Sequence, residues 1–289
     1  MSPADWQIMV TAGLVATACG LLGPFLVLRR VALLGDAVSH AVLPGIVATF
    51  LLFETRAPLP VIAGAAVFAV LCVLLIDALR STGLVKADAA IGLVFPALFS
   101  LGVLGVHQWT ANLHLDLDAT IYGEIAFVPL DPWIVAGIEL PRAAWTMLAV
   151  VALDLALVVA LWKELKLTSF DPEFARSVLI SPRLLSRLLL VAVAITAVTA
   201  FESVGAILVV TLLIVPAATA RLLTDRLWLT VALAVAVGWV AAIGGYATAV
   251  RFDASIAGAM GVVAAVCFTL AFAGRSLVLA RKRTLQSAS

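Results

Sequence analysis

Residues 59–79 read LPVIAGAAVFAVLCVLLIDAL, an apolar run whose single charged side chain is Asp77. A helix needs about 20 predominantly apolar residues to cross the hydrocarbon core of a bilayer, and this run has that length. The same composition extends through the chain, because 64% of its 289 residues are hydrophobic and only 12% are charged. In soluble domains about a quarter of the residues are charged. The sequence therefore predicts an all-α polytopic membrane protein.

Charged and turn residues divide the rest of the chain into similar apolar runs. We predict nine transmembrane helices, or eight if the run around Glu202 is a broken or re-entrant element. No Lys or Arg precedes Arg29, so the first run is not expected to be a cleaved signal peptide. The nine runs are 6–28, 36–53, 59–79, 89–106, 143–162, 184–200, 203–222, 227–250 and 256–279.

The distribution of Lys and Arg predicts the orientation of these spans. Cytoplasmic loops of multi-pass proteins carry an excess of both residues. With nine spans, fifteen of the eighteen basic residues fall on one set of loops and ends, and only Arg56, Arg142 and Arg251 fall on the other. We therefore expect a cytoplasmic C-terminus and an N-terminus on the outer side.

Several classes of function are excluded by what the sequence lacks. A net charge of +1 predicts no basic surface for nucleic acid. The chain contains neither a GxxxxGK[ST] phosphate loop nor a GxGxxG fingerprint, so we expect neither nucleotide binding nor enzymatic activity. The three cysteines lie far apart within apolar runs, which predicts no disulfide and no CxxC metal site. No permanently bound cofactor is expected.

The strongest candidate for a cation site is Asp36 with His40, within GDAVSHAVLPG at residues 35–45. Charges inside spans are costly and therefore indicate function. Residues four apart lie on one helical face, and carboxylate with neutral imidazole suits manganese, iron or zinc. The following Pro44 and Gly45 are expected to break the helix beside a polar cavity. Alternatively, Asp36 is an N-cap and His40 is a hydrogen-bonded residue of the bundle.

Two further acidic residues fall inside the predicted spans. Glu202, near the outer end of its helix, is either a third oxygen ligand for a divalent cation or an interfacial carboxylate at a turn. Asp154 lies in the middle of its span, where structural pairing and lining of a pathway both remain open. A carboxylate inside the membrane is energetically costly, so both residues are candidates for functional sites. Their positions alone do not assign a role to either.

Two predicted loops are longer than the others. The extracytoplasmic loop, residues 107–142, contains HQWTANLHLDLDATIYGE, whose His and Asp side chains either attract a cation or form a solvated acidic surface. The largest cytoplasmic loop is residues 163–183, where Ser169 or Asp171 can cap a short helix that has Pro172 in its first turn. A short helix between two spans is a candidate docking element.

Nearly the whole chain resembles the permease subunits of the metal-type ABC importers, which bring manganese, zinc or iron into bacteria. The most specific stretch is residues 23–46, which contain LRR-x4-GDAxSHxxLPG. The FESVGAILV form at residues 201–209 is more similar to the manganese and iron branch than to the zinc branch. One departure is Leu179, because a Gly often follows FARSV in this family, and the end of that helix is therefore in question. The other similar stretches are residues 87–103, 115–125, 169–178, 210–223 and 253–262.

The resemblance implies a type II ABC importer bundle, formed by a single permease domain over residues 1–289 in the bacterial inner membrane. It implies that Asp36 and His40 coordinate the transported metal, and that Glu202 assists them or gates the path. It also implies that the cytoplasmic segment within residues 163–183 is the coupling helix that docks on the ATPase. The expected contact residues are Phe170, Asp171, Pro172, Glu173, Phe174 and Ala175.

The same resemblance implies that the chain works with partners. These are a cytoplasmic ABC ATPase, an extracytoplasmic metal-binding protein and a second permease copy, identical or related, that completes the pore among the membrane lipids. The expected cargo is a divalent metal ion, manganese before zinc or iron. The alternative is a secondary, proton-coupled metal transporter, whose intramembrane acids relay protons and which needs neither ATPase nor binding protein.

Overall fold

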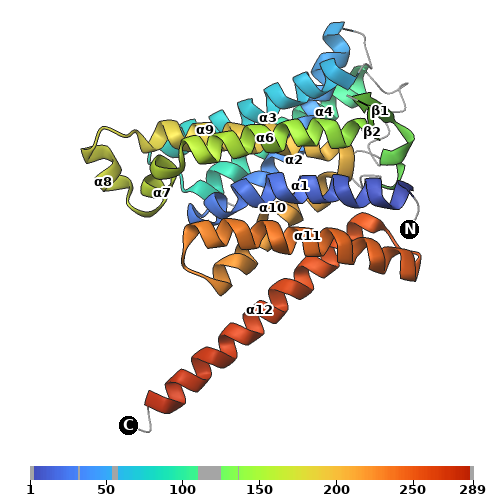
Figure 1. Cartoon of the computed structure of the whole chain (residues 1–289). Helices are drawn as coiled ribbons and strands as arrows, with labels where there is room; N and C mark the ends of the chain where they lie inside the picture. The colour runs from blue at the N-terminus through green and yellow to red at the C-terminus, as the bar shows by residue number, and fades with distance from the viewer. Residues whose placement is uncertain (1–2, 32, 54–57, 110–124, 136, 287–289) are drawn as a thin grey trace.

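A computed structural model describes residues 3–31, 33–53, 58–109, 125–135 and 137–286. This part of the chain forms a helical bundle and one small hairpin (Figure 1). Within it, nine helices are long and apolar enough to cross a membrane, as the sequence predicted. These are α1 (Pro3–Leu28), α2 (Leu34–Phe53), α3 (Pro58–Ser81), α4 (Ala87–Trp109), α6 (Arg142–Ala160), α9 (Pro182–Val204), α10 (Ala206–Leu223), α11 (Leu227–Phe252) and α12 (Ile256–Gln286).

Successive spans run in opposite directions, so the bundle has two ends (Figure 1). One end carries α7 (Trp162–Phe170) and α8 (Pro172–Ser177), and we call it the α8 end. The other carries the N-terminus and the hairpin, and we call it the hairpin end. The sequence predicted only one short helix in residues 163–183. The structure has two, because α7 continues almost directly from α6 after a single residue, Leu161.

Helix α1 lies in the centre of the bundle and packs against α6, α10 and α11. Its approach to α10 is close at Gly23, where a Cβ atom would collide with the carbonyl oxygen of Leu213. Helices α2 and α3 also meet through glycines, since a Cβ on Gly45 would lie 2.5 Å from the carbonyl oxygen of Gly64. Lipid is as apolar as a helix interior, so such small residues drive helix association in membranes by permitting close backbone packing.

Two spans meet at a single residue at the hairpin end. Gly205, with a φ of 79°, separates the C-terminus of α9 from the N-terminus of α10. Glycine adopts positive φ at little cost, so the chain reverses there with no loop. The predicted boundary within residues 200–203 therefore moves to Gly205, and Glu202 belongs to the last turn of α9.

The hairpin was not expected from the sequence. Strands β1 (Pro132–Val135) and β2 (Ile138–Pro141) pair antiparallel, with Trp133 opposite Leu140. The indole of Trp145 on α6 donates a hydrogen bond of 3.2 Å to the carbonyl oxygen of Trp133, which holds the hairpin against the bundle. A 3-10 turn, η1 (Ile125–Leu130), precedes it. The remaining predicted loop residues 110–124, with His114, Asp116 and Asp118, lie outside the described residues.

Helix α12 differs from the other spans in its surroundings. It begins against α10 and α11 at the hairpin end and then diverges from the bundle towards the C-terminus (Figure 1). Large apolar side chains such as Leu270 and Phe272 are 69% and 55% exposed along it. In a membrane these side chains face lipid or another chain.

Candidate functional site

The predicted pair Asp36 and His40 occupies the first two turns of α2, with His40 Nε2 3.8 Å from Asp36 Oδ1. Ligand atoms bound about 2.1 Å from one metal ion lie at most about 4.2 Å apart. The spacing therefore suits two ligands of the same ion. Because α2 already begins at Leu34, Asp36 is the third helical residue, so its role as the N-cap is not supported.

Helix α2 is continuous through Pro44 and Gly45 to Phe53, so the predicted break is absent. Proline is tolerated within transmembrane helices because neighbouring groups satisfy the freed carbonyl. The continuous helix fixes the depth of the pair. His40 is the seventh residue of α2 and so lies about 9 Å along it at 1.5 Å per residue. The pair therefore lies in the half of the span that begins at the α8 end.

Two aromatic side chains of α4 hold the imidazole of His40. The ring of Phe95 stacks on it with centroids 5.3 Å apart and an interplanar angle of 28°. The ring of Phe99 meets it edge-on at 5.4 Å and 77°. Such pairs add about 0.5–1.5 kcal/mol beyond burial. Phe95 and Phe99 were not predicted to be part of the site, although their spacing of four residues indicates that both face one neighbour.

The pair is accessible from outside the chain. The side chain of Asp36 is 54% exposed and that of His40 is 42% exposed. Within the described residues no group of three or more His, Cys, Asp or Glu side chains lies close enough to hold a metal ion. The side chain of Glu202 is outside this description, so its role as a third ligand stays a prediction. The described part of the chain thus offers two candidate ligands at an exposed surface, fewer than a complete coordination site needs.

The predicted coupling segment forms the turn between α7 and α8. Asp171 accepts a hydrogen bond of 2.9 Å at Oδ1 from the Phe174 amide, and Pro172 occupies the first turn. These are the N-cap and N1 preferences of helices. Phe170 and Phe174 are 51% and 54% exposed, whereas Ala175 is fully buried. The two phenylalanines are therefore the accessible apolar contacts of the segment.

Helix α8 ends where the sequence left its end in question. Leu179 has a φ of 63°, and the Ile180 amide donates a 3.0 Å hydrogen bond to the Ala175 carbonyl oxygen. The Leu179 amide bonds in turn to the Arg176 carbonyl oxygen at 3.2 Å. This is a Schellman motif, in which the left-handed position usually holds glycine. The helix thus ends in the same motif that a glycine would form, but Leu179 adopts the left-handed conformation at a higher conformational cost than glycine.

Comparison with known proteins gives consistent matches over nearly the whole chain. Residues 5–275 match the ABC 3 transport family. The manganese transport system membrane protein MntD of Bacillus subtilis is 42% identical over 273 residues, which cover 94% of this chain and 92% of that protein. The zinc transport system membrane protein TroD of Treponema pallidum is 45% identical over 266 residues, covering 92% of this chain and 72% of that protein. Among solved structures, PsaBC from Streptococcus pneumoniae in complex with Fab matches with a TM-score of 0.76 and 29% identity, covering 94% of this chain and 92% of that chain.

Proposed function

The chain belongs to the ABC 3 transport family, and we propose from this that it is the permease subunit of an ATP-driven importer of divalent transition metal ions. The observation that carries the proposal is the Asp36–His40 pair, a carboxylate and an imidazole 3.8 Å apart on a helix long and apolar enough to span the membrane. The expected family resemblance is confirmed by the match over residues 5–275. The whole chain, residues 1–289, then forms one permease domain of the bacterial inner membrane.

Manganese is the cargo we propose first, with zinc and iron as competitors. One carboxylate and one imidazole per chain accept all three ions, and geometry rather than raw affinity decides among them. The relatives support this range, since one is named for manganese and another for zinc. The manganese-like FESVGAILV stretch at residues 201–209 favours manganese.

A second permease copy, identical or related, would complete the site. Asp36 and His40 are each about half exposed on the surface of one chain. An exposed carboxylate facing lipid would be costly, and two Asp36–His40 pairs facing one another across a dimer would supply four ligands. We assign Glu202, in the last turn of α9, an assisting or gating role on the outer side.

The ATPase partner would dock at the α8 end. Phe170, Asp171, Pro172, Glu173 and Phe174 present the contact surface, while buried Ala175 packs α8 against the chain. The basic residues gather at this end, as on the cytoplasmic side of membrane proteins. The C-terminus is then cytoplasmic. The extracytoplasmic metal-binding protein would dock on the hairpin end and deliver the ion to Asp36 and His40.

The mechanism follows from the connections between these parts. Along the chain, α7 and α8 connect α6 to α9. Both α6 and α9 pack against α1, which is followed directly by α2. Nucleotide-driven movement of α8 would shift these helices and change access to Asp36 and His40 between two states. The alternative of a secondary, proton-coupled carrier is not supported by the family match or by the relatives.

The test is reconstitution of the permease with its ATPase in proteoliposomes, with the metal-loaded binding protein on the outer side. Radiolabelled manganese uptake should require both partners and ATP, and a proton gradient should not replace ATP. Competition by zinc and iron would rank the cargo. Uptake by the permease alone under a proton gradient would contradict the proposal and favour the secondary carrier.

A further inference from the structure

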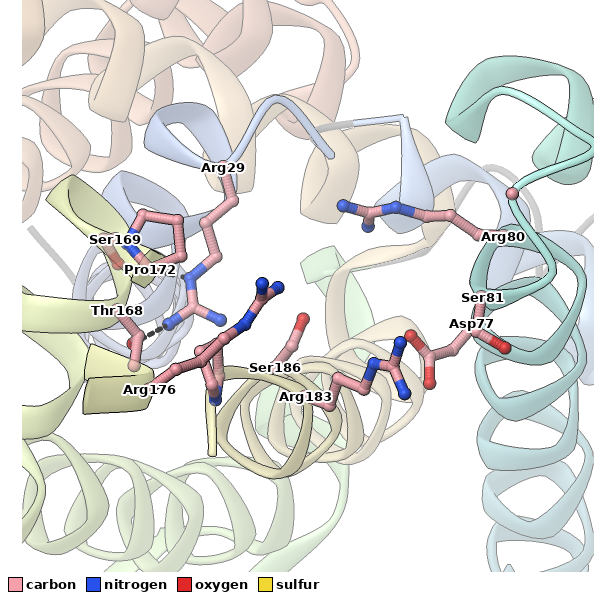
Figure 2. Close-up of a pocket in the computed structure, with 12 residues that line it drawn as sticks. Arg29, Asp77, Arg80, Ser81, Thr168, Ser169, Pro172, Arg176, Arg183 and Ser186 are labelled. Atoms are coloured by element: carbon pink, nitrogen blue, oxygen red, sulfur yellow. Dashed lines mark hydrogen bonds between the residues drawn. The ribbon is translucent and has the colours of Figure 1, made fainter. Parts of the chain in front are cut away.

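A cavity of about 450 Å³ lies at the α8 end, where the ends of α1, α3 and α7 meet α8 and the start of α9. It is separate from the Asp36–His40 pair, neither residue of which lines it. Figure 2 shows its side chains facing a common space. The lining residues are Arg29, Asp77, Arg80, Ser81, Gly83, Thr168, Ser169, Pro172, Arg176, Pro182, Arg183 and Ser186.

The lining is strongly basic, with four arginines and a single carboxylate, Asp77. That carboxylate is already engaged, because the guanidinium of Arg187 on α9 lies 2.6 Å from its Oδ2. The guanidinium groups of Arg80 and Arg176 make no hydrogen bond or ion pair with any residue that the structure describes. In Figure 2 they reach into the space from opposite sides. The cavity therefore holds positive charge that the described side chains do not neutralise.

Arg29 is the most deeply placed of these arginines. It donates hydrogen bonds of 2.9 Å to Thr168 Oγ1 and 3.2 Å to Ser169 Oγ, both neutral acceptors on α7. Burial, and then the charge of Arg80, lower the pKa of the Arg29 guanidinium to about 10. The group remains protonated at neutral pH. A buried charge normally has a counter-charge, whereas the charged group that lowers the pKa of Arg29 is another arginine, Arg80.

We propose that this cavity binds a phosphate-bearing anion. Guanidinium groups pair with phosphate oxygens through two parallel hydrogen bonds, and Ser186 adds a hydroxyl group to the wall. A volume of about 450 Å³ is within the range of small-ligand sites. Cargo cations are repelled by the arginines, so the cavity is not part of the metal path.

The anion has two possible sources with the same chemistry. An anionic phospholipid would place its headgroup in the cavity from the inner leaflet, as basic pockets between transmembrane helices do on the cytoplasmic side. Free phosphate would enter from the cytoplasm. In either case the anion would join Arg29 after α1, Arg80 at the end of α3 and Arg176 on α8. It would thereby connect the coupling segment to the membrane helices.

The experiment uses the full permease–ATPase complex, purified in detergent. Native mass spectrometry would count retained phosphatidylglycerol against the neutral lipid phosphatidylcholine, and inorganic phosphate would be titrated against thermal unfolding of the lipid-free complex. Arg80→Gln and Arg176→Gln each remove one unpaired guanidinium. Lys163→Gln, on the exposed face of α7 at the same end, removes one charge outside the cavity.

We expect the wild-type complex to bind the anion, and each arginine variant to bind it about tenfold more weakly, because each loses a charge-assisted hydrogen bond. Lys163→Gln should match the wild type. Preference for phosphatidylglycerol identifies the lipid as the source, and a stabilising phosphate titration identifies the free anion. Binding of neither probe would overturn the proposal. So would equal effects of all three substitutions, or arginine variants that change ATPase association alone. The readouts do not depend on which cargo the permease carries.

Discussion

The Thr196 hydroxyl donates a hydrogen bond of 2.8 Å to Asp154 Oδ2, which joins α9 to α6 inside the bundle. Both side chains are only 1% exposed. Asp154 Oδ1 has no hydrogen-bond partner in the part of the chain that the structure describes. These two helices precede and follow the coupling segment α7–α8. The burial of Asp154 against Thr196 favours structural pairing over lining of a pathway.

Asp154→Asn should keep the complex as stable as the wild type or make it more stable. The amide oxygen still accepts from Thr196, and no ionisable group remains in the apolar interior. Asp154→Ala removes the acceptor and leaves a void, so it should lose about 1–3 kcal/mol. Chemical unfolding in detergent measures both, with metal uptake as the parallel readout. An Asp154→Asn protein that folds normally but transports no metal would show that Asp154 belongs to the pathway.

Substitution of either Asp36 or His40 by Ala should reduce metal uptake to background, because each removes one of the two proposed ligands of this pair. Assembly with the ATPase should persist, since both side chains are about half exposed and lie on α2, outside the proposed ATPase contact surface. Asp225→Ala is the matched control. It removes a 79% exposed carboxylate that pairs with Arg221 at the α8 end, and such surface pairs contribute little. Near-normal uptake by the Asp36→Ala and His40→Ala variants would show that these residues are not the ligands of the transported metal.

Phe95→Ala should weaken metal binding without abolishing it, because the His40 imidazole loses the ring stacked 5.3 Å from it and samples more orientations. We expect a severalfold higher metal concentration for half-maximal uptake and a smaller change in the maximal rate. Phe95→Tyr keeps an aromatic face and should restore most of the affinity. If Ala and Tyr variants show the same defect, Phe95 does not act through the imidazole.

The spans could be predicted from the sequence, because hydrophobicity alone indicates where a helix crosses a membrane. The contacts between spans could not. Both lipid and the bundle interior are apolar, so residues around α6 carry no signal that Asp154 meets Thr196. The Asp36–His40 pair was predictable because it is local to one helix. The arginine cavity was not, since Arg29, Arg80 and Arg176 come from three separate segments of the chain.

Phe174→Ala should weaken association with the ATPase by about tenfold or more, as loss of an aromatic anchor does at interfaces. The side chain is 54% exposed at the proposed coupling segment, so its truncation should cost the permease little packing. Co-purification and titration binding of the ATPase to the permease measure the effect. Leu223→Ala, which truncates a side chain 55% exposed at the same end, should bind normally. Equal weakening by both substitutions would place the ATPase contact elsewhere or spread it over the whole end.

Leu179→Gly should stabilise the coupling segment in the isolated permease. Leu179 holds a φ of 63° at the C-terminus of α8, and its side chain is 97% exposed, so truncation loses almost no packing. An L-residue in this left-handed conformation costs about 1–2 kcal/mol, part of which is offset by the greater freedom of glycine in the unfolded chain. The net gain should be about 0.5–1 kcal/mol, measured as slower backbone hydrogen exchange in α8. Leu179→Ala is the control, because it removes the same exposed side chain but keeps the Cβ that makes the conformation costly. If Ala and Gly protect α8 equally, the left-handed strain at Leu179 is not what limits the stability of this turn.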